Sequence, residues 1–185
     1  MIKMTAVVPG LFYQPDLISA DVERQTVQYL DGREWSTKLS RRTQHFGYEY
    51  DYKSRKVPVS ASPLGGPIKQ IADYLAQYNI LNPTQCIVNE YTKTQGISGH
   101  TDSFIFGDTV VSVSLSAPCE MIFTKDGVEK RITLMPRSML VMSGEARNSW
   151  KHEIKGTVKV PLPDGTTYTK PGDYRRISLT YRTVK

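Results

Sequence analysis

Two of the three histidines in this chain of 185 residues lie in a pattern that could hold a metal ion. His100 and Asp102 are two positions apart, so in extended backbone the imidazole and the carboxylate point the same way. His152 could add a second imidazole from a distant part of the chain. The same residue types also occur by chance on polar surfaces, so the pattern alone leaves both interpretations open.

If these side chains do meet, the site they predict is catalytic. Two imidazoles and one carboxylate leave coordination positions open for a co-substrate and dioxygen, and non-haem iron(II) oxygenases use such a set. A structural zinc site would be closed by a fourth protein ligand. The third histidine, His45, is interpreted as a lid or surface residue.

Residues 176–182 alternate between apolar and polar side chains, which predicts a strand with two different faces. Arg176, Ser178 and Arg182 share the polar face. This face is either the solvated side of a sheet or the lining of an anion pocket. In a pocket, Arg176 would bind a remote carboxylate bidentately, and Arg182 would neutralise the end near the metal.

The second half of the chain has the pattern of a β sandwich or barrel. Short strands are predicted at 86–91, 109–116, 120–124, 129–134, 138–143 and 174–182. Asn89 and Tyr91 share one face of the first of these strands, where they are either ordinary sheet residues or donors to a co-substrate. A hairpin turn is predicted at 125–127, and a protruding ribbon or loop at 155–173.

The first half is predicted to be helical and irregular. Apolar spacing indicates a helix over 16–30 and a second one that begins at Ile68, after a loop at 60–67. Between them, residues 41–56 carry tyrosines at alternate positions between basic flanks, which predicts a strand or ribbon.

Composition limits the class of protein. The length fits one domain, and no apolar run is long enough to span a bilayer or to act as a secretion signal. Cys86 and Cys119 lie in apolar runs without a CxxC spacing, so we expect no disulfide and an intracellular location, in the cytoplasm or nucleus. A net charge of +6 makes a polyanionic partner such as nucleic acid plausible. Its binding surface would combine the basic residues around the tyrosines with those of the late loop, unless they are simply solvated side chains: Arg41, Arg42, Lys53, Arg55, Lys56, Lys151, Lys155, Lys159 and Lys170.

Taken together, the order and spacing of these motifs resemble the AlkB family of Fe(II)- and 2-oxoglutarate-dependent dioxygenases. The residues that carry the resemblance are Asn89-x-Tyr91, His100-x-Asp102, the strand at 112–116, residues 144–147 running to His152, and Arg176-x-Ser178-x-x-x-Arg182. It covers the chain from about residue 86 to the C-terminus. Residues 44–50 extend it weakly into the segment that forms a nucleotide-recognition lid in the family.

The resemblance implies an α+β, mainly β fold, a double-stranded β-helix (jelly-roll) supported by N-terminal helices. A single domain, 1–185, would contain helical support and a lid in 1–85 and the jelly-roll core in 86–185. His100, Asp102 and His152 would bind Fe(II). The contacts to 2-oxoglutarate would come from Asn89, Tyr91, Arg176, Ser178 and Arg182, and Arg147 would have a structural role.

The activity that the resemblance implies is oxidative demethylation of N-alkylated nucleic-acid bases, with release of formaldehyde, succinate and CO2. Methylated DNA or RNA would then be the partner of a monomeric enzyme without membrane contact. Candidate substrate contacts are Arg41, Tyr48, Tyr50 and Phe104, and Phe104 stands where repair members often carry an acid. Alternatives are hydroxylation of a tRNA wobble base, modification of a protein side chain, or non-catalytic binding of nucleic acid.

Overall fold

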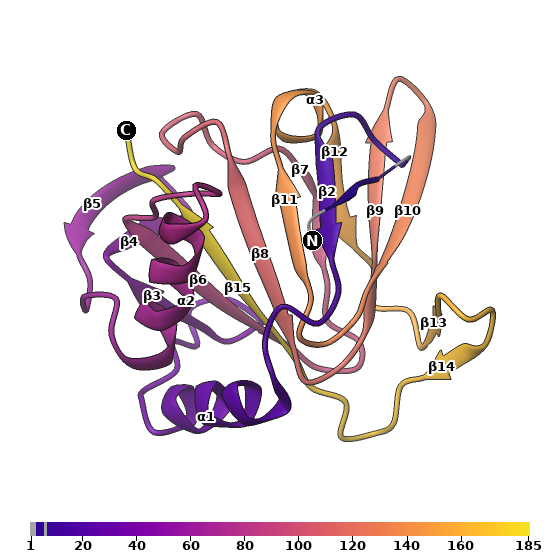
Figure 1. Ribbon diagram of the computed structural model, residues 1–185, viewed down its shortest axis with the longest axis horizontal. Coiled ribbons are helices and arrows are strands. Elements are labelled where there is room, and N and C mark those ends of the chain that lie inside the picture. The colour runs from indigo at the N-terminus through magenta and orange to yellow at the C-terminus, as the bar shows by residue number, and fades with distance from the viewer. Residues whose placement is uncertain (1–2, 6) are drawn as a thin grey trace.

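The computed structural model describes residues 3–5 and 7–185, but not the side chains of residues 3, 4 and 56–59. Its main feature is a pair of antiparallel sheets (Figure 1). The larger sheet has seven strands in the order β1 (Lys3–Met4), β2 (Leu11–Gln14), β11 (Met139–Met142), β8 (Val110–Leu115), β15 (Arg176–Arg182), β6 (Gln85–Tyr91) and β3 (Thr43–Phe46). The smaller has four, in the order β10 (Val128–Leu134), β9 (Cys119–Lys125), β12 (Lys151–Ile154) and β7 (Ile97–His100). The predicted α+β, mainly β jelly-roll is confirmed.

Two short ribbons lie outside these sheets, toward opposite sides of the view in Figure 1. The first, which we call the tyrosine ribbon, pairs β4 (Tyr48–Asp51) with β5 (Lys56–Ser60). The second pairs β13 (Lys159–Pro161) with β14 (Thr167–Thr169). Both correspond to ribbons predicted from the alternating tyrosines and from the turn residues of the late segment.

The turn between β9 and β10 shows how local sequence sets the strand register. Lys125 pairs with Val128, so the loop contains only Asp126 and Gly127. Both have positive φ, +49° and +76°, as a two-residue hairpin loop with a type I′ turn requires. The predicted hairpin is confirmed, and it fixes the side chains of β9 that face the other sheet.

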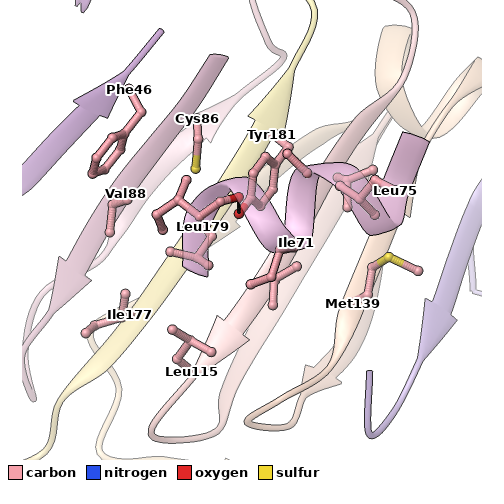
Figure 2. Close-up of a cluster of buried hydrophobic side chains, with 14 of the residues drawn as sticks. Phe46, Ile71, Leu75, Cys86, Val88, Leu115, Met139, Ile177, Leu179 and Tyr181 are labelled. Atoms are coloured by element: carbon pink, nitrogen blue, oxygen red, sulfur yellow. Dashed lines mark hydrogen bonds between the residues drawn. The ribbon is translucent and has the colours of Figure 1, made fainter. Parts of the chain in front are cut away.

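The main hydrophobic core lies between the larger sheet and the helices α1 (Ala20–Asp31) and α2 (Gly66–Gln77) (Figure 1). Leu179 and Tyr181 of β15 pack with Ile71 and Leu75 of α2, as Figure 2 shows. Each fully buried aliphatic side chain of this kind contributes about 1.5–3 kcal/mol. Because the apolar face of β15 is committed to the helices, its polar face must turn toward the smaller sheet.

Helix α1 begins later than the apolar spacing predicted. It starts at Ala20, after Ser19, whose side chain accepts a hydrogen bond from the backbone N–H of Val22. Asp16 has a φ of +51°, in the left-handed region, so the helix cannot extend back to it. N-capping by serine therefore set this boundary, and hydrophobic periodicity did not.

Several strands of the first hundred residues escaped prediction. β3 lies in the segment 41–56, for which a strand or ribbon was predicted, but β2, beside β11 in the larger sheet, and β7, at the edge of the smaller one, were not predicted. These segments are four residues long and mix polar with apolar side chains, so their own pattern is weak. They become strands because a neighbouring strand supplies hydrogen-bond partners.

Both cysteines are free and buried, as expected. Cys86 packs in the core under the helices, and Cys119 packs in a second apolar cluster. Among the described residues, no helix has the length and apolar character needed to cross a membrane.

Candidate active site

The smaller sheet brings the three predicted metal ligands together. His152 in β12 is paired in register with His100 at the end of β7, and the ring centroids are 4.4 Å apart. Asp102 Oδ1 lies 3.8 Å from His100 Nε2 and 3.5 Å from His152 Nε2. One ligand atom from each residue lies within 4.8 Å of the others. This arrangement fits a single metal ion.

The hydrogen bonds around these side chains prepare them for a cation. His100 Nδ1 lies 2.8 Å from the Ser98 carbonyl oxygen, which can only accept, so Nδ1 carries the proton and Nε2 keeps its lone pair. Asp102 Oδ2 accepts a hydrogen bond of 2.6 Å from Arg182 Nε. Asp102 Oδ1 is buried and has no partner among the described residues. An orphaned carboxylate oxygen beside two imidazole nitrogens is the donor set expected for Fe(II).

Burial and charge favour the protonation states that ligate metals. Burial lowers the pKa of His152 to about 4, although the charge of Asp102 opposes this, so the imidazole is neutral at pH 7. Burial by itself would raise the pKa of Asp102, but Arg182 and His152 outweigh it and hold this pKa well below its usual range. A neutral imidazole and an ionised carboxylate are the forms that bind a metal ion.

A second group of buried polar atoms lies at the other end of β15. Arg176 is 1% exposed, and its Nη2 donates a hydrogen bond of 2.8 Å to Ser114 Oγ. Its guanidinium lies over the Tyr91 ring at 5.4 Å, while Nε and Nη1 are buried without a partner among the described residues. Two unpaired guanidinium donors match the two oxygens of a carboxylate. The alternative that this face of β15 is simply solvated is wrong.

A cavity of about 50 Å³ is lined by two of the three predicted metal ligands, His100 and His152, and by Arg176. The predicted residues that line it are Asn89, Tyr91, His100, His152, Arg176, Ser178 and Arg182. The cavity is also lined by Thr180, which shares the polar face of β15, and by residues that the sequence did not assign to the site: Ile97, Ser112, Met121, Met142 and Ile154. Ser112 and Thr180 are direct neighbours across β8 and β15. The alternation of serine and valine in β8 is the signal that could have found Ser112.

Arg147, in the short helix α3 (Gly144–Asn148), holds the loop that contains Asp102. Its Nη1 donates to the Asp102 carbonyl at 2.9 Å, its Nη2 to the Ser103 carbonyl at 2.9 Å, and its Nε to the Gly107 carbonyl at 3.2 Å. The side chain is buried, so these bonds are shielded from water. Such a clamp agrees with the structural role expected for Arg147.

The predicted substrate contacts differ in how freely they can meet a ligand. Phe104 is 78% exposed and Tyr48 is 37% exposed. Tyr50 instead packs edge-on against Tyr52 at 5.1 Å and against the buried Phe106 at 5.5 Å between ring centroids. We therefore treat Phe104 and Tyr48 as the accessible aromatic residues and Tyr50 as part of the ribbon's own packing.

Two of the basic residues interpreted as a nucleic-acid surface are engaged within the protein. Lys170 is only 3% exposed, and its ammonium lies 4.6 Å from the centre of the Tyr174 ring, so its assignment to a surface loop is wrong. Arg42 forms hydrogen bonds of 2.7 Å with both carboxylate oxygens of Glu90. Exposed basic side chains remain at Lys53, Arg55, Lys151, Lys155 and Lys159, and the side chain of Lys56 lies outside the described residues.

A larger hollow of about 730 Å³ lies elsewhere, between the loop after α1 and the strands β3 and β4. His45 lines it, together with Trp35 and Lys38. None of the predicted metal or co-substrate residues lines this hollow. His45 is therefore outside the ligand set, as expected.

Known proteins are similar to this chain in sequence and in architecture. A family model described as the 2OG-Fe(II) oxygenase superfamily matches residues 10–182. The "Alkylated DNA repair protein ALKBH8 homolog" of Arabidopsis thaliana is 33% identical over 207 residues, covering 96% of this chain and 59% of that protein. The "tRNA (carboxymethyluridine(34)-5-O)-methyltransferase ALKBH8" of Macaca fascicularis is 33% identical over 168 residues, covering 83% of this chain and 25% of that protein.

The chain therefore spans about three fifths of the first relative and a quarter of the second. Among solved structures, that of OsALKBH1 aligns with a TM-score of 0.69 at 17% identity. The alignment covers 99% of this chain and 100% of the other. At this identity the likeness concerns the fold, a jelly-roll shared almost from end to end.

Proposed function

This chain belongs to the 2OG-Fe(II) oxygenase superfamily, and on that premise we propose that it oxidises a C–H bond on a nucleic-acid base. The resemblance to AlkB, the enzymatic class and the use of Fe(II) and 2-oxoglutarate are confirmed. The specific activity we propose is removal of an N-alkyl group as formaldehyde. One observation carries the proposal: the orphaned Asp102 oxygen lies beside His100 and His152, and these two histidines line the same cavity as Arg176 with its orphaned donors.

His100, Asp102 and His152 would hold Fe(II) through two imidazoles and one carboxylate. With this metal and 2-oxoglutarate bound, the family's chemistry would use dioxygen, one atom of which converts the keto acid to succinate and CO2 while the other is inserted into a C–H bond. Arg182 keeps Asp102 ionised and oriented, which leaves Oδ1 available for the metal. The protein's part is thus to provide ligands that need no rearrangement before binding.

Arg176 would bind the carboxylate of 2-oxoglutarate that is remote from the metal. Its position is set by Ser114 and by the Tyr91 ring, so the two free N–H groups have a fixed direction. Asn89 and Ser178 add polar atoms to the same wall of the cavity. The site contains two cationic side chains, Arg176 and Arg182, and one anionic side chain, Asp102. The surplus of positive charge favours an anionic ligand.

Two exposed aromatic residues, Phe104 in the loop just after Asp102 and Tyr48 of the tyrosine ribbon, would form the mouth of the site and could stack on a base. No acidic side chain is among the residues that line the cavity, and Phe104 occupies the position where a carboxylate would meet a cationic base. These features favour a neutral base as the substrate. The name of the Arabidopsis relative, which mentions alkylated DNA, supports an alkylated nucleic acid.

A second candidate is hydroxylation of a modified uridine in tRNA. The name of the macaque relative, a methyltransferase of carboxymethyluridine, supports it, and so does Phe104, which offers no carboxylate to a cationic base. In this case the hydroxyl group would remain on the product and no formaldehyde would be released.

Mass spectrometry of the reaction products tests both candidates. Protein loaded with Fe(II) would be incubated with 2-oxoglutarate and with methylated DNA and RNA oligonucleotides or tRNA, and His100→Ala would serve as the inactive control. A loss of 14 mass units with stoichiometric formaldehyde would support demethylation, and a gain of 16 units without formaldehyde would support hydroxylation. Activity on proteins alone would overturn the proposal of a nucleic-acid substrate.

A further inference from the structure

Arg41, which precedes the tyrosine ribbon, reaches the wall of the active-site cavity. Its Nε donates a hydrogen bond of 2.8 Å to Oδ1 of Asn89, a buried residue of β6 that lines the cavity. The guanidinium also lies 6.0 Å from the centre of the Tyr52 ring, next to the ribbon. One side chain therefore contacts both the ribbon and the co-substrate wall.

This hydrogen bond determines how the amide of Asn89 is turned. A guanidinium has only donors, so the atom of Asn89 that faces it must be the carbonyl oxygen. The amide N–H groups then point away from the Arg41 guanidinium, and Asn89 lines the cavity. In the opposite orientation Asn89 would face Arg41 with donors and would present an acceptor to the ligand.

The neighbouring Arg42 cannot orient the Asn89 amide. It is bound to Glu90, which alternates with Asn89 along β6 and so lies on the other face of the strand. The backbone carbonyl of Arg42 accepts a hydrogen bond of 2.9 Å from the Glu90 N–H, which fixes the register of the two segments. The strand register thus assigns one arginine to each face.

We propose that Arg41 is a positioning residue for 2-oxoglutarate: it fixes the Asn89 amide so that its N–H groups are available to an oxygen atom of the co-substrate. The inference rests on the proposed role of the cavity as the 2-oxoglutarate site. It differs from the expectation that Arg41 stacks on the substrate base, because its guanidinium is already held by Asn89 and Tyr52. Loss of Arg41 should therefore weaken co-substrate binding even when no nucleic acid is present.

Isothermal titration of 2-oxoglutarate into protein loaded with Mn(II), in place of Fe(II), measures this binding without turnover. Arg41→Met should raise the dissociation constant roughly three- to tenfold, as expected for one hydrogen bond that orients a ligand contact. Arg41→Lys should recover part of the affinity, since an ammonium can also donate to Asn89. Arg33→Met is the matched control, because Arg33 also lies over aromatic rings, Tyr29 and Phe46, but neither of these residues lines the cavity as Asn89 does.

A double-mutant cycle with Asn89→Ala separates positioning from a general structural effect. If Arg41 acts through Asn89, Arg41→Met should cause little further loss of affinity once Asn89 is absent. Equal losses in both backgrounds, or an unchanged dissociation constant in Arg41→Met, would overturn the inference. If the wild-type protein itself bound no 2-oxoglutarate, the proposed co-substrate site would fail, which is a distinguishable result.

Discussion

The inner end of the active site and its mouth are built in different ways. Asp102, His152 and Arg176 are buried, and both Asp102 and Arg176 are held by polar partners on neighbouring strands of the fold. At the mouth, Phe104 and Tyr48 are exposed and lie on a loop and a two-stranded ribbon. The contrast indicates that the oxidation chemistry depends on buried side chains held by hydrogen bonds. The recognition of the substrate depends instead on exposed side chains of a loop and a ribbon.

The largest effect should come from the metal ligands. His100→Ala should abolish Fe(II) binding and 2-oxoglutarate turnover but change thermal unfolding little, because His100 is only partly buried. Asp102→Ala should abolish the same activities and also destabilise the fold by about 3–5 kcal/mol, since Arg182 would keep an uncompensated buried charge. Metal titration and circular dichroism melting measure the two properties separately. Stoichiometric iron binding by His100→Ala would show the triad assignment to be wrong.

The next effect concerns the co-substrate end of the cavity. Arg176→Ala should raise the 2-oxoglutarate concentration for half-maximal turnover roughly a hundredfold or more, because a buried carboxylate loses a bidentate partner. Arg176→Lys should recover only part, since an ammonium cannot reproduce the planar fork. Steady-state kinetics at saturating iron would measure both variants. An unchanged requirement for 2-oxoglutarate would remove Arg176 from the co-substrate site.

Substitutions at the mouth should reduce activity less than those at the inner end and should leave the use of 2-oxoglutarate unchanged. Tyr48→Ala or Phe104→Ala should lower turnover of the nucleic-acid substrate roughly five- to a hundredfold. This factor corresponds to the free energy of stacking one base on an aromatic ring, about 1–3 kcal/mol. Consumption of 2-oxoglutarate without substrate should stay at the wild-type rate, and substrate binding should weaken steeply with salt. Parallel assays of substrate and 2-oxoglutarate test this separation. If both activities fell together, the division into inner end and mouth would not hold.

The smallest effect concerns the outer face of β6, where Glu90 accepts hydrogen bonds from Arg42 and Arg175. Burial would raise the pKa of Glu90, but the two guanidinium groups outweigh it and hold this pKa below its usual value. With the folded pKa below the unfolded one, the cluster stabilises the protein above the unfolded pKa, and this stabilisation is lost as pH falls through the folded pKa.

Urea unfolding of wild type and Glu90→Gln would measure this contribution. The variant should lose about 1–2 kcal/mol of unfolding free energy at pH 7, a value reduced because Arg42 and Arg175 are partly exposed. The difference should shrink as the pH falls below the ordinary pKa of a glutamate and through the lower folded pKa of Glu90, where the wild-type carboxyl also becomes neutral. A difference that stays constant with pH would show that the charge of Glu90 is not what stabilises the fold.

Much of the fold could be predicted because its signals are local. The alternation in β15, the turn residues Asp126 and Gly127, and the apolar spacing of α2 act within a few residues of one another. The four-residue strands β2 and β7 could not be predicted, since partner strands far away in the sequence supply their hydrogen bonds. The surface assignment of Lys170 failed for a related reason: its burial against Tyr174 is a tertiary contact.

The sequence by itself determined the chemistry of this protein: which side chains can ligate a metal, that His100 and Asp102 lie on one side of an extended segment, and that Arg176 and Arg182 share a face. Residue type and strand periodicity are enough for these conclusions. Only the tertiary structure decided which atoms are left without partners, that Arg182 binds Asp102, and that Arg41 rather than Arg42 reaches Asn89. These outcomes depend on register between strands distant in the chain, where a shift of one residue would turn each side chain to the opposite face.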